Sequence, residues 1–201
     1  MKIEVTQEPI GALAAYALIP IAFEVKEVFD VAAEPGDDGG FSLSAHPLRE
    51  SYWKDYDRVG GEGPTRWAKR FDVSKWGFFA ARIDGKRVGG AAVAHDTPSL
   101  DLLEGRSDLA VLWDLRVAPS ARCRGVGSAL FEAAEAWACA RRCRHLKVET
   151  QNVNVVACRF YASQGCVLRA AHRGAYPELP DEIQLLWYKD LAHRESAEGG
   201  T

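Results

Sequence analysis

A short basic stretch with two glycines, Arg122-Cys-Arg-Gly-Val-Gly127, has the residue types of an anion-binding loop. Gly125 and Gly127 carry no Cβ, so successive backbone N–H groups can converge on one ligand. A helical pattern follows directly, and the first turn of a helix offers unpaired N–H groups and the positive end of its dipole. Arg122 and Arg124 add positive charge nearby. The stretch therefore predicts a site for a di- or triphosphate-like group.

The neighbouring sequence predicts the elements that would position this loop. A mainly apolar run predicts a strand that ends at Val117, and apolar residues at helical spacing predict a helix over 129–142. The core stripe of that helix is expected to be Leu130, Ala134, Trp137 and Ala138. Alternation predicts a further strand over 146–150, followed by a short helix over 155–164 that Gly165 ends.

The remaining pattern predicts more strands than helices. Asp84-Gly85 between two β-rich runs, 76–83 and 86–95, predicts a hairpin. Residues 2–6 read as an entry strand and 10–31 as mostly helical material, although Val25 and Val28 suit either state. Two alternatives are open for the segment 97–108: it folds over an acceptor pocket, or it is a surface loop whose leucines are buried beneath it. Other assignments are closing strands at 166–168 and 183–188, loops at 34–40 and 60–64, and a tail from His193.

The loop also resembles a known signature. Arg122-Cys-Arg-Gly-Val-Gly127 is similar to the [Q/R]-x-x-G-x-[G/A] motif of the Gcn5-related N-acetyltransferases (GNAT), whose loop holds the pyrophosphate of acetyl-CoA. Leu115–Pro119 and Leu146–Gly165 look like the family's fourth strand and its fifth strand with the following helix. Within the family the chain is most similar to streptothricin acetyltransferases, on three stretches: Phe23–Val31, Lys54-Asp-Tyr56, and Val148–Cys158 leading to Tyr161.

The resemblance implies one α/β (α+β) domain with a mixed, mostly antiparallel sheet of six or seven strands flanked by helices. The sheet is expected to splay between its fourth and fifth strands and admit acetyl-CoA there. The domain would span residues 1–195, divided into an acceptor-side half (1–108), an acetyl-CoA-binding core (109–168) and closing strands (169–195), with a tail at 196–201. Twelve positions are expected to bind acetyl-CoA: Leu115, Arg116, Val117, Arg122, Cys123, Arg124, Gly125, Val126, Gly127, Ser128, Asn154 and Tyr161.

The resemblance also implies catalytic roles. Acetyl transfer to an amine needs a deprotonated amine, a stabilised oxyanion and a proton for the departing thiolate. Tyr161 is expected to supply that proton, and the backbone N–H of Leu115 to bind the oxyanion. The base would be Asp114 or Glu149, since relatives carry acids there. Either carboxylate could instead pair with Arg116 or Lys147 across the sheet. Trp113 stands where relatives often carry glutamate, which leaves the base open.

The expected acceptor is the primary amine of a small cationic molecule, and the specific expectation is a streptothricin-type antibiotic. Glu27, Asp30, Asp55 and Asp57 are candidates to bind its ammonium groups, and the alternative for each is a solvated acidic surface. Two other functions remain open at this point. The chain could acetylate a protein or peptide amine, or it could be a non-catalytic acyl-CoA-binding module.

Composition sets further bounds. The chain has 201 residues, 47% of them hydrophobic, and a formal net charge of −3, which argues against a nucleic-acid binder. Its five cysteines form no C-x-x-C pair, so neither a disulfide framework nor a metal site is expected. The apolar run 10–23 is shorter than the ~20 residues of a membrane span and contains Pro20. We expect a cytoplasmic protein without a membrane segment, as a monomer or homodimer.

Overall fold

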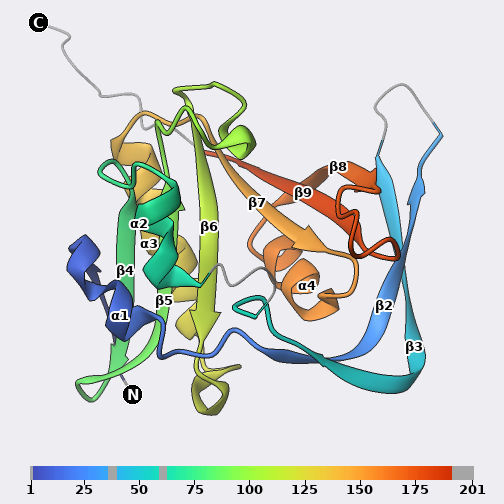
Figure 1. Cartoon of the computed structure of the whole chain (residues 1–201), viewed down its shortest axis with the longest axis horizontal. Helices are drawn as coiled ribbons and strands as arrows, with labels where there is room; N and C mark the ends of the chain where they lie inside the picture. Colours follow the sequence, from blue (N-terminus) through green and yellow to red (C-terminus); the bar gives the residue numbers. More distant parts are fainter. Residues whose placement is uncertain (1, 36–39, 59–62, 192–201) are drawn as a thin grey trace, which may run out of the picture.

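A seven-stranded sheet forms the frame of the protein in the computed structural model, which describes residues 2–35, 40–58 and 63–191. Across the sheet the strands follow the order β1-β4-β5-β6-β7-β9-β8 (Figure 1). Their bounds are β1 Ile3–Glu8, β4 Gly77–Ile83, β5 Lys86–Ala94, β6 Leu109–Val117, β7 His145–Gln151, β8 Val167–Arg173 and β9 Ile183–Asp190. Every neighbouring pair is antiparallel except β6 and β7. The expected mixed, mostly antiparallel sheet is confirmed.

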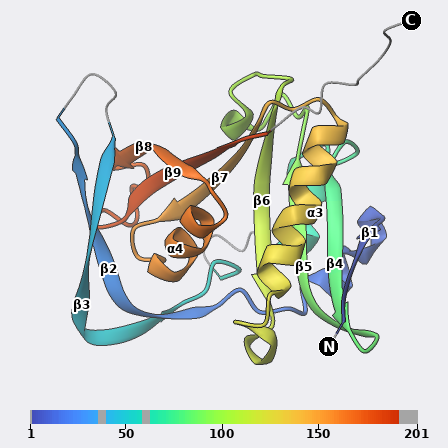
Figure 2. The same ribbon diagram turned by 180° about the vertical axis from the view of Figure 1, so that it is seen from behind.

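Helices cover both faces of this sheet. Helix α3 (Val126–Ala140) lies across one face of β4, β5 and β6, with α4 (Val155–Ser163) on the same side of the molecule (Figure 2). Two single-turn helices, α1 (Leu13–Tyr16) and α2 (Trp67–Arg70), lie on the opposite face (Figure 1). The predicted stripe of α3 is buried along its whole length. The helix begins three residues before the predicted start, because Gly125 with φ +82° turns the chain into it.

The sheet splays between β6 and β7, as expected. These strands pair only from Leu109 to Leu112 and from His145 to Val148 (Figure 1). On the other side of β6, the register with β5 shifts at the same level, so that Trp113 is an extra residue opposite Ala92 and Val93. A bulge of this kind bends its strand and increases the local twist. It directs the end of β6 away from β7 and opens the gap between them.

The hairpin between β4 and β5 is also confirmed. Asp84 and Gly85 have φ of +48° and +76°, the conformation that a two-residue turn requires. The segment 97–108 contains a short 3-10 turn, Asp101–Leu103, with Leu100 and Leu103 buried against an aromatic cluster around Trp67 and Trp76. Of the two alternatives for this segment, the structure shows the loop with its leucines tucked beneath it.

The helical assignment of residues 10–31 was wrong beyond Tyr16. Residues Phe23–Ala33 form strand β2, which pairs with β3 (Phe41–Lys54) in a separate two-stranded sheet. Pro20 cannot continue a helix, and the β-branched residues at 25, 28 and 31 favour an extended chain with a long partner strand. The sequence pattern missed β3 because few of its residues are buried.

Three predicted segments fall wholly or partly outside the described residues: the loops at 34–40 and 60–64, and the tail from His193. Among the helices that the structure describes, none combines the length and the apolar character needed to cross a lipid bilayer.

Candidate active site

The anion-binding loop joins the end of β6 to the start of α3. Cys123 has φ +57° and Gly125 φ +82°, so the backbone reverses twice before the helix. Because α3 begins at Val126, the N–H groups of Val126, Gly127 and Ser128 belong to its first turn, where no intrahelical acceptor exists. These donors at a helix N-terminus suit a pyrophosphate.

The two glycines are required for different reasons. Gly125 adopts a backbone conformation that side chains rarely allow, while a Cβ there would meet only Ile3, at 3.7 Å. A Cβ on Gly127 would lie 3.3 Å from the ring of Phe160 on α4. Gly127 therefore allows α3 and α4 to approach each other beside the loop, and Gly125 fixes the conformation of the loop.

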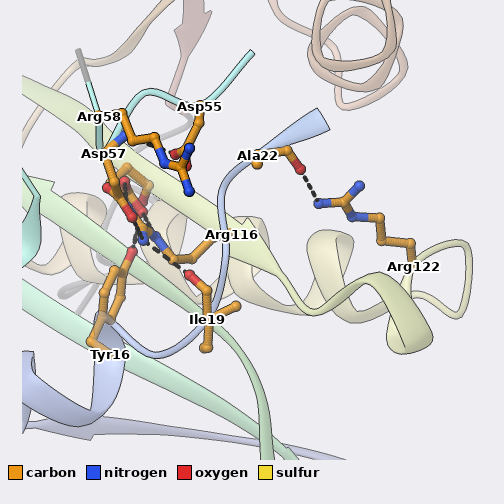
Figure 3. Close-up of polar contacts among 9 residues, drawn as sticks. Tyr16, Ile19, Ala22, Asp55, Asp57, Arg58, Arg116 and Arg122 are labelled. Carbon is orange, nitrogen blue, oxygen red and sulfur yellow. Dashed lines mark hydrogen bonds and ion pairs between the residues drawn. The ribbon is translucent and has the colours of Figure 1, made fainter. Parts of the chain in front are cut away.

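Arg122 ties the loop to a distant segment. Its Nε donates to the carbonyl of Val117 at 3.2 Å, and its Nη2 donates to the carbonyl of Ala22 at 3.1 Å (Figure 3). The guanidinium is exposed. The structure thus places this arginine between the loop and the chain segment that enters β2.

Replacing Gly125 by Ala should weaken CoA binding about tenfold. A side chain at this positive φ costs about 1–2 kcal/mol, and a backbone that relaxes to relieve this strain displaces the N–H donors of the first turn. Gly85→Ala is the matched control: φ is +76° there, and a Cβ meets nothing within 4 Å. Calorimetric titration with CoA, with unfolding measured in parallel, should show both variants destabilised and only Gly125→Ala weakened in binding. Equal CoA affinity in the two variants would refute this role for the loop.

The apex of the splay is the second part of the site. Val148 is the last residue of β7 paired with β6, so Glu149 is the first one beyond the pairing. On β6 the bulge at Trp113 lies at the same level. Lys147, two residues before Glu149 on the same face of the strand, packs on the side of the sheet that carries α1 and α2. Glu149 therefore points from the apex towards the face opposite α3.

Asp114 lies in a dense ionic cluster next to the bulge. Arg116, whose side chain is 1% exposed, donates to Asp114 at 2.6 and 2.9 Å and to both oxygens of Asp57 at 2.9 and 3.1 Å (Figure 3). The Tyr16 hydroxyl donates to Asp114 at 2.5 Å, and Arg116 also donates to the carbonyl of Ile19 at 3.0 Å. The cluster anchors the chain around residues 19 and 57 to β6.

Burial and charge interactions shift the pKa values of two members of this cluster, so that Tyr16 stays neutral and Arg116 stays charged. Burial raises the pKa of Tyr16 well above its usual value, and the charge of Asp114 adds to that effect. Burial alone would lower the pKa of Arg116, but its hydrogen bonds and charge interactions with Asp114 and Asp57 outweigh burial and raise it. The carboxylate of Asp114 thus accepts charge-assisted hydrogen bonds from Arg116 and a further bond from Tyr16. The pairing with Arg116 that the sequence left open for Asp114 is present.

Glu149 is held differently. The hydroxyl of Tyr176, from the loop between β8 and β9, donates to its Oε1 at 2.5 Å. Lys147 pairs instead with Glu104, at 2.8 Å. Among the described residues Glu149 has no arginine or lysine partner in the structure, so its carboxylate is the less neutralised of the two candidate bases.

Tyr161 projects from α4 into the core beside the splay. The residue is 7% exposed, and its ring packs against Phe131 and Phe160 with centroids 6.0 and 5.1 Å away. Its hydroxyl makes no hydrogen bond with a residue that the structure describes. Burial raises the pKa of Tyr161 far above its usual value, with a smaller contribution from the charge of Asp114. The phenol therefore keeps its proton at neutral pH.

Asn154 begins α4. Its Oδ1 accepts from the N–H of Ala157 at 3.2 Å, the geometry of an N-cap. This N-cap fixes the start of the helix that carries Tyr161. Its expected contact with the pantetheine arm stays a prediction, as does the oxyanion role of Leu115, which lies two residues beyond the bulge.

The predicted acidic residues do not gather in one place. Glu27 on β2 forms a bidentate pair with Arg159 of α4, at 2.6 and 3.1 Å. Asp30 pairs with His46 of β3 at 3.1 Å. Only Asp55 lines the cavity of about 430 Å³ next to the splay, where its neighbours are Ala22, Trp53 and Arg58.

Several site residues had no signal in the sequence. Tyr16 and Tyr176 contact the two candidate bases from segments 98 and 27 residues away. Lys54 and Glu182 form a buried ion pair that joins the end of β3 to the loop before β9. Neither tyrosine belongs to a motif, and only the fold brings them to the candidate bases.

Comparisons with known proteins agree with this geometry. A family model described as "Acetyltransferase (GNAT) family" matches residues 45–166. A streptothricin acetyltransferase of Escherichia coli is 31% identical over 172 residues, 83% of this chain and 84% of that protein. One of Streptomyces lavendulae is 31% identical over 144 residues, 72% of this chain and 70% of that protein.

Solved structures show the same fold. Nourseothricin acetyltransferase matches with a TM-score of 0.73 at 24% identity, over 96% of this chain and 100% of that one. A Bacillus anthracis protein solved in complex with acetyl coenzyme A matches with a TM-score of 0.76 at 20% identity, over 94% and 99%. The resemblance stated from the sequence is confirmed. The chain belongs to the GNAT family of N-acetyltransferases.

Proposed function

We propose that the protein transfers the acetyl group of acetyl-CoA to a primary amine of a small cationic molecule of the streptothricin type. The observation that carries this proposal is the apex of the splay, where the carboxylate of Glu149, which has no ion-pair partner among the described residues, stands at the level of the β6 bulge. The loop before α3 offers N–H donors for the pyrophosphate. The similarity to streptothricin acetyltransferases supports the choice of substrate.

The open edge of β6 suits the rest of the co-substrate. Beyond Leu112 the strand has no β7 partner, so its backbone groups can pair with the pantetheine arm as an added strand would. Acetyl-CoA supplies the activated acetyl group, and the residues of the chain bind it, orient it and move protons.

The chemistry then divides among three groups. Glu149 accepts a proton from the ammonium of the acceptor, so that the amine nitrogen can attack the thioester carbonyl. A backbone N–H of β6, for which we propose Leu115, binds the oxyanion that develops as the C–N bond forms. As the C–S bond breaks, Tyr161 donates its proton to the thiolate and regains one from the acetylated amine by way of solvent.

We propose Glu149 over Asp114 as the base because Arg116 and Tyr16 already bind Asp114. Asp114 then has a supporting role: it holds Arg116, which in turn holds Asp57 and the carbonyl of Ile19. This arrangement fixes the acceptor side of β6.

The cavity beside Asp55 suits a second ammonium group. Trp53 is 72% exposed, a large apolar surface that a cation can cover through its ring face. Among the described residues the one ion-pair partner of Asp55 is the exposed Arg58, at 3.3 Å, so the charge of Asp55 is available to a ligand. Glu27 and Asp30 are already paired elsewhere, and we propose no acceptor role for them.

A thiol-release assay with acetyl-CoA over a panel of amines tests the function. The panel should contain a streptothricin, simple monoamines and peptides with free N-termini, and turnover should be fastest with the streptothricin. Equal turnover of peptide amines would favour a protein acetyltransferase. Tight CoA binding without turnover of any amine would show that the protein is a non-catalytic acyl-CoA-binding module.

Asp55→Asn should raise KM for a polycationic acceptor about threefold to tenfold and leave kcat nearly unchanged, because it removes binding that is equal in ground and transition states. The effect should shrink at high salt, since the pair lies near solvent. Asp30→Asn is the matched control, because it removes a carboxylate from the surface outside the cavity. Equal KM values for the two variants would exclude Asp55 from the acceptor site.

A further inference from the structure

A chain of hydrogen bonds leads to Glu149 from three different elements. The Tyr56 hydroxyl, just after β3, donates to Oε1 of Gln151 on β7. Gln151 donates from Nε2 to the Tyr176 hydroxyl at 2.9 Å, and Tyr176 donates to Glu149 at 2.5 Å. Every bond points the same way, towards the carboxylate. Such a chain polarises its members and strengthens the last bond.

The members of this chain are half-buried. Burial raises the pKa of Tyr176 far above its usual value, and the charge of Glu149 adds to the effect. Burial likewise raises the pKa of Tyr56, opposed by a hydrogen bond with the side chain of Asn154. Both phenols therefore keep their hydroxyl protons at neutral pH and can donate them in these bonds.

The other charged groups around Glu149 are already paired. Lys147, on the same face of β7, binds Glu104, and Asp114 across the splay binds Arg116. On β9 the residue opposite Glu149 is Leu186, which carries no charge. On β8, the strand beyond β9, the nearby ionisable residue is His172, which lies opposite Gln184 of β9. Tyr176 is thus the one hydrogen-bond donor among the described residues that contacts this carboxylate.

We infer that Tyr176 is a positioning residue for Glu149: its hydrogen bond, backed by Gln151 and Tyr56, fixes the carboxylate at the apex. The inference rests on the proposed function, since it concerns the base of that reaction. One oxygen of Glu149 accepts from Tyr176, and the other is left to take the proton of the acceptor ammonium. Tyr176 touches neither reactant in this scheme.

The test is a double-mutant cycle between Tyr176→Phe and Glu149→Gln, with acetyl-CoA and one amine acceptor. Tyr176→Phe should lower the plateau of kcat about tenfold. The acid limb of its kcat profile should move to higher pH, because the variant lacks the donor to the carboxylate. In the Glu149→Gln background, Tyr176→Phe should change kcat by less than twofold.

Tyr188→Phe is the matched control. It deletes an equivalent bond, from Tyr188 to Glu104 at 2.5 Å, on the far side of Lys147. The control should keep the acid limb of the wild type. A Tyr176→Phe enzyme with an unmoved acid limb, or an equal loss of kcat in both backgrounds, would overturn the inference and leave the proposed function intact. A wild-type protein that turns over no amine would overturn both.

Discussion

Replacing Tyr161 by Phe should lower kcat about 10²-fold or more and leave the affinity for acetyl-CoA nearly unchanged. The variant keeps the ring, which packs against Phe131 and Phe160, and loses only the hydroxyl. If that hydroxyl protonates the departing thiolate, its loss is felt in the transition state and little in binding. Steady-state kinetics with saturating acceptor, combined with titration of CoA, measures the two effects separately.

The pH dependence gives a second check on Tyr161. A group with a raised pKa remains protonated until the pH passes that value, and burial raises the pKa of Tyr161 far above the usual value of a phenol. The kcat profile of the wild type should therefore show no alkaline loss caused by Tyr161 below about pH 10.

The unfolding temperature of Tyr161→Phe shows whether the hydroxyl of Tyr161 contributes to stability as well as to catalysis. Because the hydroxyl makes no hydrogen bond with a described residue, Tyr161→Phe should unfold at nearly the temperature of the wild type. Tyr16→Phe is the contrasting variant, since its hydroxyl bonds to Asp114, and it should be less stable. A Tyr161→Phe enzyme with the kcat of the wild type would show that the residue only packs in the core.

The sequence predicted the cofactor half of the site better than the acceptor half. The loop, the bulged strand and α4 are continuous in sequence, so glycine placement and periodicity locate them directly. The start of α3 was placed three residues late because Gly125 resembles loop sequence, although it is the residue that turns the chain into the helix. The splay followed from the family resemblance and is confirmed by the pairing of β6 and β7.

The acceptor half depends on contacts that no local pattern encodes. Residues 23–33 have apolar positions that suit a helix or a strand, and their long partner β3 decided between the two. That change of element also separates Glu27 from Asp30, which a helix would have placed on one side.

The choice between the two carboxylates at the apex could not be made from sequence either. Both follow strand patterns, and both have a basic residue two positions away, Arg116 for Asp114 and Lys147 for Glu149. The structure shows that only the first of these pairs forms, because Glu104 from a distant loop binds Lys147.

Replacing Glu149 by Gln should lower kcat by about 10²-fold to 10⁴-fold, the range expected for loss of a general base. The amide has the same shape and can still accept from Tyr176, so the fold and CoA binding should change little. The acid limb of the kcat profile should also disappear in the variant, because the group that must lose its proton is gone. Activity should recover in part at high pH, where the acceptor amine is already neutral.

Asp114→Asn is the variant to set beside it, because it changes the other candidate base in the same way. Here the loss should appear first in stability, by about 2 kcal/mol, since the change removes charge-assisted bonds to a buried arginine. Its kcat should fall less than that of Glu149→Gln and keep its acid limb. If Asp114→Asn instead abolished the acid limb at unchanged stability while Glu149→Gln retained it, Asp114 would be the base. The ion pair with Arg116 would then have to open during turnover, which would make the segment around Asp57 a moving part of the site.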